Sequence, residues 1–314
     1  MEAILFMQVS DLKKYISKTT FFCFVFFLIQ HVLGMTLDEM NGLTLYNDDG
    51  RNRLIRDSVN TEIVLLGSSR CYHHFNPQVF EDSLGLSCYN CGERRMGILF
   101  MYDRFRTILK NHIPQVVIYE VTPDYDLFVE NDKSVYIKDL RPYYWTDDYA
   151  RVIIDSISST EKYKMLSRLY CYNGKVIDII EALIAKKENY NKGQNPKIGK
   201  YNIEAIPTGT ENEKEYDPLK LYYINKLIDD CTENNIQLVF SSSPLLGERQ
   251  GNVFDNFAEL CVKKRAVFLN HYFDKSFSLA PSLYSDAVHL NKVGSDRYSA
   301  IIASELKNII KHEN

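Results

Sequence analysis

Apolar runs of strand length alternate with longer segments of helical period along most of the chain. Five runs have the length and the content of β-branched and aromatic residues that buried strands have, and they cover 62–66, 86–90, 115–121, 236–241 and 266–270. Helical periodicity is found at 77–83, 94–111, 218–234, 253–264 and from about 291 onward. This alternation predicts a mostly parallel five-stranded sheet with helices on both faces, which is a three-layer α/β/α sandwich.

One long segment, at about 122–216, interrupts the alternation. It contains an aromatic-rich turn around Trp145, two or three expected helices within 147–187, and a polar loop at 189–200. The segment leaves the third strand at its carboxyl end, where open parallel sheets form their sites. We therefore expect a helical insertion that acts as a lid or a substrate wall, or else one that only covers apolar surface.

A Phe-rich run lies near the N-terminus, at 21–37, and three lysines precede it. Counted from Thr19, the run reaches the ~17 to 25 residues that cross a bilayer. Basic residues before the run and acidic residues after it place the N-terminus inside. The sequence thus predicts a short cytoplasmic segment 1–18, a signal-anchor helix 19–37, and an extracytoplasmic domain 38–314 anchored in the membrane by a single pass.

Two alternatives stay open for this N-terminal run. Small residues at Val32 and Gly34 allow cleavage as a signal peptide. The run also fits a buried helix of a soluble protein, although its apolar residues cover all sides of the helix.

Composition narrows the classes of function. The formal net charge is -4, from 37 basic and 41 acidic side chains, so no broad basic field exists to attract nucleic acid. Seven cysteines, an odd number, do not make a disulfide framework. Cys88 and Cys91 have the spacing of a redox or zinc half-site, but we expect small buried side chains there, with an oxidised pair as the alternative.

Two short stretches offer catalytic chemistry. Gly67-Ser68-Ser69-Arg70 follows the first strand, and Asp286 precedes His289 by three residues just before the last helix. A serine hydroxyl becomes nucleophilic when a histidine takes its proton and a carboxylate fixes the histidine tautomer. Either stretch alone also fits a structural role, as a turn after a strand or as an acid at a helix start. Together, on this topology, they favour a nucleophile, a base and an orienting acid.

These residues resemble the SGNH (GDSL-type) hydrolase superfamily, which has a flavodoxin-like fold. Its first block, Gly-Asp-Ser, aligns with Gly67 to Ser69, and its last block, Asp-x-x-His-Leu-Asn-x-x-Gly, aligns with 286–294. The resemblance implies Ser69 as nucleophile, His289 as base and Asp286 as the orienting acid. The Gly-Ser-Ser form, the membrane segment and the insertion resemble the extracytoplasmic branch that includes the D-alanyl-lipoteichoic acid synthesis and alginate acetylation proteins.

The two middle blocks of the family match less well. The resemblance makes Gly92 the expected oxyanion amide, and it places Asp124 where the family has an asparagine donor. An ionised carboxylate repels an oxyanion, and loss of one donor costs about 2.7 to 4 kcal/mol. Asp124 is therefore protonated, or Arg70 supplies a donor, or catalysis is weak or absent. Arg70 also has the chemistry to bind an anionic sugar group, to pair with Asp124, or to form a surface ion pair.

The resemblance implies a membrane-anchored extracytoplasmic serine esterase or O-acyltransferase, with an acetyl group on an envelope or capsular glycan as the expected substrate. A serine triad of this kind needs no cofactor. Cys71, His73 and His74 lie close after Ser69 but lack the second ligand pair of a metal site, so no metal is expected. The expected partners are an acylated glycan or other ester, the membrane and a membrane acyltransferase. The alternatives are a catalytically silent module that binds glycan or such an acyltransferase, and a soluble intracellular esterase.

Overall fold

A five-stranded parallel sheet forms the centre of the fold in the computed structural model, which describes residues 9–43, 48–184 and 191–312. The strand order is β2-β1-β3-β5-β7, and every neighbouring pair is parallel. The prediction of a mostly parallel five-stranded sheet is therefore confirmed. The strands are β1 Ile63–Gly67, β2 Cys88–Asn90, β3 Val116–Glu120, β5 Gln237–Ser242 and β7 Val267–Asn270, and a separate pair is formed by β4 Thr208–Thr210 and β6 Glu248–Gln250.

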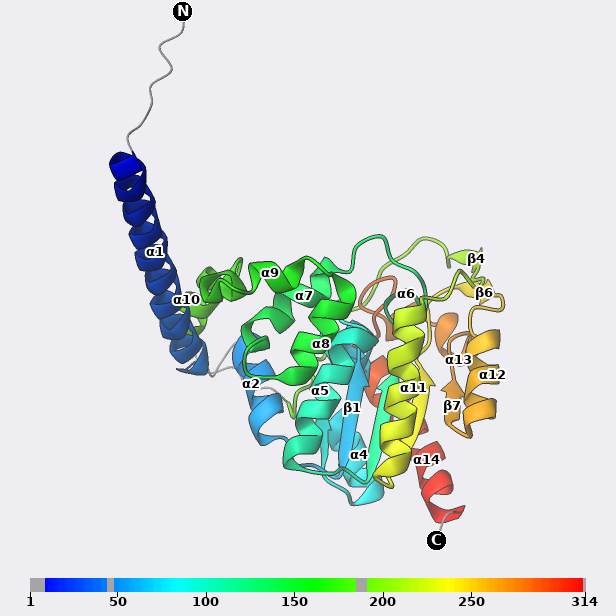
Figure 1. Ribbon diagram of the computed structural model, residues 1–314. Helices are drawn as coiled ribbons and strands as arrows, with labels where there is room; N and C mark the ends of the chain where they lie inside the picture. Colours follow the sequence, from blue (N-terminus) through cyan, green and yellow to red (C-terminus); the bar gives the residue numbers. More distant parts are fainter. Residues whose placement is uncertain (1–8, 44–47, 185–190, 313–314) are drawn as a thin grey trace, which may run out of the picture. The chain divides into compact units, whose positions relative to one another are not determined.

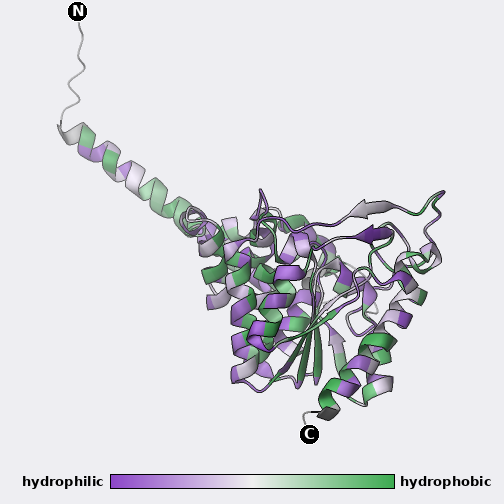
Figure 2. Ribbon diagram, turned by 90° about the vertical axis from the view of Figure 1, so that its right-hand side faces the viewer, coloured by the Kyte–Doolittle hydropathy of each residue, from purple (hydrophilic) through white to green (hydrophobic). Residues whose placement is uncertain are grey.

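Helices cover both faces of the sheet (Figure 1). On one face, Ile63, Leu65, Ile118 and Val239 share a core with α14 and α4. On the other, α5 and α11 lie against the strands. Figure 2 shows that the strands at the centre of the five-stranded sheet are hydrophobic. The helices near the sheet are α3 Ser69–His74, α4 Pro77–Leu84, α5 Ile98–Asn111, α6 Pro123–Asp126, α11 Pro218–Glu233, α12 Asp255–Lys264, α13 Lys275–Ser278, η3 Pro281–Leu283 and α14 Lys292–His312.

The strand order places a topological switch at β1. β2 pairs with one edge of β1, and β3 pairs with the other edge of β1. The chain therefore continues from β1 to the strand on one side and later crosses to the strand on the other side. Gly67 is in register with Glu120, and Glu120 is in register with Ser241. The carboxyl ends of three strands therefore meet at one edge, the usual place for a site in an open α/β sheet.

The helix expected over 94–111 begins later, at Ile98. Arg95 adopts a left-handed backbone conformation with a φ of 61°, which a helix does not continue through. Gly97 is the N-cap, and a Cβ there would approach the Tyr125 carbonyl oxygen to 2.2 Å. The stretch between β2 and α5 is therefore a loop against the sheet edge, which brings Gly92 close to α3.

Cys88 begins β2 and Cys91 directly follows it, and both are buried free thiols. Burial raises the pKa of the Cys91 thiol to about 12. Both side chains therefore act as small hydrophobic groups, as the pattern predicts.

The chain divides into two compact units. One contains 51–139 with 186–314 and carries the sheet. The other contains 1–50 with 140–185, so helices of the insertion share a unit with the N-terminal helix.

The helices not yet given, from both units, are α1 Val9–Leu43, α2 Asp48–Ser58, α7 Ser134–Leu140, η1 Arg141–Tyr143, α8 Asp148–Ile157, α9 Glu161–Lys164, η2 Arg168–Tyr172 and α10 Val176–Ile184.

Helix α1 is long and apolar enough to cross a bilayer, over residues 12–43. Only 11% of the most apolar stretch of α1 is buried, whereas the core helix of a soluble protein is mostly buried. Within its unit, α1 packs against η2 and α10. The length and composition of α1 thus agree with a membrane anchor or a signal sequence.

Candidate active site

The turn after β1 places Ser69 at the sheet edge. Gly67 has a φ of +140°, and a Cβ there would approach the Glu120 carbonyl oxygen to 2.6 Å, so only glycine fits without a shift of the backbone. Ser68 is the N-cap of α3, and its hydroxyl is 2.6 Å from the Thr122 hydroxyl. Ser68 is therefore engaged in the structure of the turn, whereas Ser69 begins the helix.

The side chains of Ser69, His289 and Asp286 form a chain of contacts: Ser69 lies within hydrogen-bonding distance of His289, and His289 lies within hydrogen-bonding distance of Asp286. The Ser69 Oγ is 2.9 Å from the His289 Nε2, and the His289 Nδ1 is 3.0 Å from both carboxylate oxygens of Asp286. With the ionised carboxylate accepting at Nδ1, the neutral imidazole carries its proton there and leaves Nε2 as an acceptor for the serine hydroxyl. The structure brings together the three residues that the sequence places in catalytic roles.

A tight local turn holds the acid against the base. The Asp286 Oδ1 accepts hydrogen bonds from the backbone amides of Val288 and His289, at 3.0 and 2.9 Å. Aspartate side chains commonly bond the backbone two or three residues onward in this way. The three-residue spacing therefore fixes the Asp286 carboxylate beside the His289 ring without help from distant parts of the chain.

Lys197 adds a positive charge next to the acid. Its Nζ is 2.8 Å from the Asp286 Oδ2. Partial burial opposes ionisation of Asp286, but Lys197, the Val288 amide and His289 together lower its pKa well below the usual range. The pKa of His289 is also lowered from 6.5, mainly by burial, with Asp286 opposing that shift. His289 is therefore neutral at pH 7, as a general base requires.

A buried polar network holds the backbone next to His289. The Ser243 hydroxyl donates to the Glu120 Oε1 at 2.9 Å and lies 2.8 Å from the His74 Nδ1. The Leu290 amide donates to the His74 Nε2 at 3.0 Å. Because Ser243 gives its proton to Glu120, the His74 Nδ1 carries a proton and donates it to Ser243. Burial, with the nearby Arg70 charge, lowers the pKa of His74 well below 6.5 and keeps this neutral tautomer.

His73 supports the same region from a different side. Its Nδ1 is 2.5 Å from the Asn195 carbonyl oxygen, and its ring centre is 5.1 Å from that of His289. Burial lowers the pKa of His73 to about 4. His73 and His74 are therefore neutral buried groups that pack around the base.

Gly92 lies against α3 but its amide is already engaged. The Gly92 N–H donates to the Asn90 Oδ1 at 2.9 Å. A Cβ at Gly92 would approach the Tyr72 amide nitrogen to 2.7 Å, so glycine permits this close approach. Ser69 is the first residue of α3, and the first amides of a helix have no partner within it. The Ser69 amide is therefore a second candidate donor for an oxyanion.

Arg70 and Asp124 lie in different surroundings. Arg70 is buried, with its Nε 3.0 Å from the Ser243 Oγ and 3.3 Å from the Glu120 Oε1. Arg70 therefore pairs with Glu120, whereas the Asp124 side chain is 68% exposed and pairs with Lys214 at 2.7 Å. Among the described residues, Arg70 therefore forms neither the pair with Asp124 nor the surface ion pair that the sequence left open.

The residues that sequence reasoning missed come from segments far from both motifs. Lys197 lies in the polar loop of the insertion, and Ser243 follows β5. The sequence did carry a signal for Glu120 as a site residue. Glu120 is a carboxylate at the end of an apolar run, and that run forms a five-residue strand that is buried throughout. A buried carboxylate needs partners, and the carboxyl end of a strand places those partners at the site.

A serine, an imidazole of fixed tautomer and an orienting carboxylate, at the carboxyl edge of a parallel sheet, have the geometry of a serine hydrolase triad. The arrangement has the chemistry for transfer of an acyl group through a serine ester. Water or an alcohol as the second acceptor gives hydrolysis or transfer, respectively.

Two solved structures have similar folds. One, assigned as a lipolytic protein of the G-D-S-L family from Desulfitobacterium hafniense DCB-2, is 13% identical, covers 78% of this chain and 99% of its own, and has a TM-score of 0.38. The other, assigned as an acylhydrolase from Bacteroides fragilis NCTC 9343, is 11% identical, covers 84% and 97%, and has a TM-score of 0.43. No family model and no curated protein matches the sequence.

Proposed function

We propose that this protein is a serine ester hydrolase or O-acyltransferase of the SGNH type. The observation that carries the proposal is the continuous contact from Ser69 through His289 to Asp286, with distances of 2.9 and 3.0 Å. The lowered pKa of His289 supports it, because the base is unprotonated at neutral pH.

The reaction has two halves. The Ser69 Oγ attacks the ester carbonyl carbon while His289 takes its proton, and the tetrahedral intermediate expels the alcohol, which receives that proton from His289. The acyl group is now an ester of Ser69. Water or a sugar hydroxyl then gives its proton to His289 and attacks this ester, and His289 returns the proton to Ser69. Asp286 stays ionised and stabilises the imidazolium in both halves.

We further propose that the substrate is an acylated glycan of the cell envelope or capsule and that the acyl group is acetyl. A single-pass anchor through α1, with the lysines before it inside, would place the catalytic unit outside the cytoplasm. The apolar composition of α1 and its small buried share support the membrane anchor in this proposal. Fractionation of cells tests it: recovery of the full-length protein in the cytosol contradicts the anchor.

A serine-directed fluorophosphonate tests the nucleophile. We expect the full-length protein in detergent to be labelled, and we expect Ser69→Ala to lose the label, while Ser68→Ala keeps it because Ser68 is a helix cap. Turnover of a small acetyl ester should follow the same pattern. Labelling that survives Ser69→Ala contradicts the proposed nucleophile.

A second candidate function, that of a silent module that binds glycan or a membrane acyltransferase, has support from the oxyanion side. The Gly92 amide is engaged with Asn90, and the Asp124 carboxylate is paired at the surface. This candidate predicts binding of glycan, or of the acyltransferase, without fluorophosphonate labelling. Labelling that depends on Ser69 eliminates it.

A further inference from the structure

Helix α10 presents an apolar stripe to the solvent. The stripe consists of Val176, Ile177, Ile180, Leu183 and Ile184, which occupy positions i, i+1, i+4, i+7 and i+8 and therefore one side of the helix. All five are exposed, and Ile177 and Ile184 are 70% and 79% exposed. Such a stripe costs free energy in water unless another apolar phase covers it.

The other sides of α10 have different surroundings. Ile179 and Ala182 are buried and hold the helix to its own unit. Asp178 and Glu181 lie between the stripe and the buried side, with Glu181 next to Ile177 and Asp178 farther from the stripe. α10 thus has two apolar sides, one packed against its own unit and one facing the solvent, and a charged side between them.

The segment before α10 is fixed to the N-terminal helix of the same unit. The Tyr172 hydroxyl donates to the Asp38 Oδ1 at 2.6 Å, and the Arg168 Nε donates to the Asp38 Oδ2 at 2.6 Å. The Ser167 hydroxyl bonds Gln30. A Cβ on Gly34 would approach the Arg168 Cβ to 2.7 Å, so the two backbones are close. These contacts fix η2 at the level of residues 30–38 of α1.

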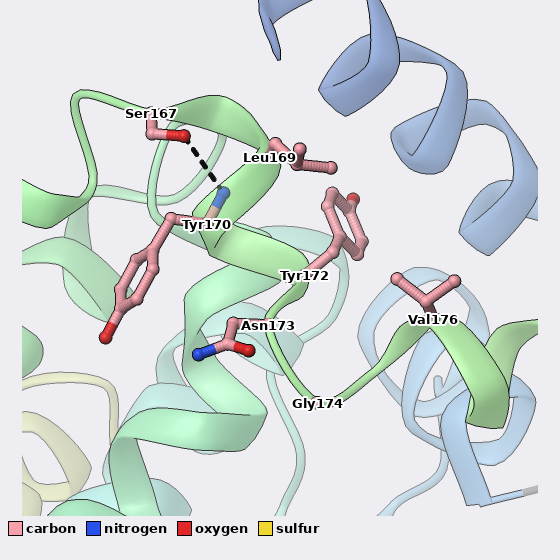
Figure 3. A pocket seen from close by; sticks show the side chains of 7 residues that line it. All are labelled: Ser167, Leu169, Tyr170, Tyr172, Asn173, Gly174 and Val176. Carbon is pink, nitrogen blue, oxygen red and sulfur yellow. Dashed lines mark hydrogen bonds between the residues drawn. The ribbon is translucent and has the colours of Figure 1, made fainter.

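Apolar surface continues from the stripe toward α1. A hollow of about 470 Å³ is lined by residues between Ser167 and Val176, and Val176 belongs to both the hollow and the stripe. Figure 3 shows Leu169 and Tyr172 pointing to the side on which α1 runs. The stripe and the apolar surface of α1 therefore belong to one continuous face of this unit.

The depth of α10 in the proposed membrane follows from the position of α1. In the proposed topology the bilayer-crossing run is 19–37, so residues 30–38 lie at its outer end, where hydrocarbon gives way to headgroups. A helix with an apolar stripe at that level, and a charged side next to the stripe, has the character of helices that lie in a membrane interface. We propose that α10 lies in the outer interface of the bilayer, with its stripe among the lipid acyl chains. This inference rests on the anchoring in the proposed function.

Lipid depth quenching of the full-length protein in vesicles tests the inference. Cys23 is the exposed cysteine among the described residues, and the other six cysteines are buried, so an environment-sensitive fluorophore reports one site at a time. The native Cys23 reports the anchor. Ile177→Cys and Ile180→Cys, each with Cys23→Ser, report the stripe, and Asp178→Cys with Cys23→Ser, on the charged side, is the matched control. The vesicles contain phosphatidylethanolamine and phosphatidylglycerol, with or without a lipid that carries a doxyl quencher on its acyl chain.

We expect the doxyl lipid to reduce the fluorescence at 23, 177 and 180 at least about twofold and to leave the label at 178 nearly unchanged, because on α10 only the stripe meets acyl chains. Quenching at 23 without quenching at 177 and 180 overturns the inference while the anchor stands. The absence of quenching at 23 overturns the anchor itself. Labels at 177 and 180 that are shielded from water yet unquenched by lipid show a second copy of the chain on this face, which also overturns the inference.

Discussion

Replacement of Lys197 by methionine should move the acid limb of the pH profile of activity to higher pH. Lys197 and His289 contact the same Asp286 oxygen, at 2.8 and 3.0 Å, so their charges are separated by no more than about 6 Å when His289 is protonated. The ammonium disfavours the imidazolium and helps to lower the pKa of His289. Methionine keeps the length of the side chain and removes the charge, so the pKa of His289 should rise.

The size of the shift follows from the separation and the exposure of the charges. Two unit charges about 6 Å apart interact by ~0.7 kcal/mol in water and ~2.8 kcal/mol at an effective dielectric constant of about 20. Lys197 and Asp286 are 34% and 36% exposed, so solvent screening places the interaction toward the lower value. We expect about 0.7 to 1.4 kcal/mol, which corresponds to a rise of about half to one pH unit.

The assay is kcat/KM for a small acetyl ester, measured from pH 4 to pH 9. In the natural protein the acid limb should have its midpoint below pH 6.5, because the pKa of His289 is lowered and only its neutral form accepts a proton. Lys197→Arg keeps the charge and should retain that midpoint. Lys292→Met is the matched control, since Lys292 pairs at 2.6 Å with Asp296. An acid limb that stays in place in Lys197→Met, or moves to lower pH, refutes the reasoning.

Three further predictions concern the free energy of unfolding, measured with urea in detergent by circular dichroism. Gly67→Ala should cost about 3 kcal/mol, because its Cβ would meet a backbone carbonyl at 2.6 Å, whereas Gly85→Ala, with nothing within 4 Å, should cost about 1 kcal/mol; equal losses contradict the steric argument. His74→Leu should cost about 1 to 3 kcal/mol and lower kcat, since the Leu290 amide loses its buried acceptor, and an unchanged kcat would show that this network does not position the base. His73 has a pKa of about 4 in the fold against about 6.5 when unfolded, so its stabilisation is complete above pH 6.5 and is lost as the pH falls toward 4. Between pH 7 and pH 5 the loss should reach about 2 kcal/mol, and the same loss in His73→Gln contradicts this origin.

The sheet was predictable because its strands are local patterns. Each of the five apolar runs became a strand within one or two residues of its expected limits, and a βαβ alternation leaves little choice of architecture. The start of α5 was expected four residues early. The left-handed Arg95 and the close approach of Gly97 to Tyr125 decide that boundary, and both depend on tertiary packing.

The residues of the candidate site were predictable to different degrees. Asp286 and His289 are neighbours in one turn, so their spacing already implied the contact. The Ser69 position followed from the end of β1. The resemblance alone nominated Gly92 and Asp124, and the surroundings of those residues, an engaged amide and a paired surface carboxylate, were invisible in the sequence.

The sequence by itself determined the order of strands and helices, the apolar N-terminal helix and the pairing of Asp286 with His289, because each depends on residues a few positions apart. Only the tertiary structure decided the partners that tune and hold this pair. Lys197 is 89 residues from Asp286 and His74 is 216 residues from Leu290, and no periodicity or spacing specifies such contacts. They form when packing of the parallel sheet brings distant segments to one edge, where desolvation and hydrogen bonding then set the protonation of the site.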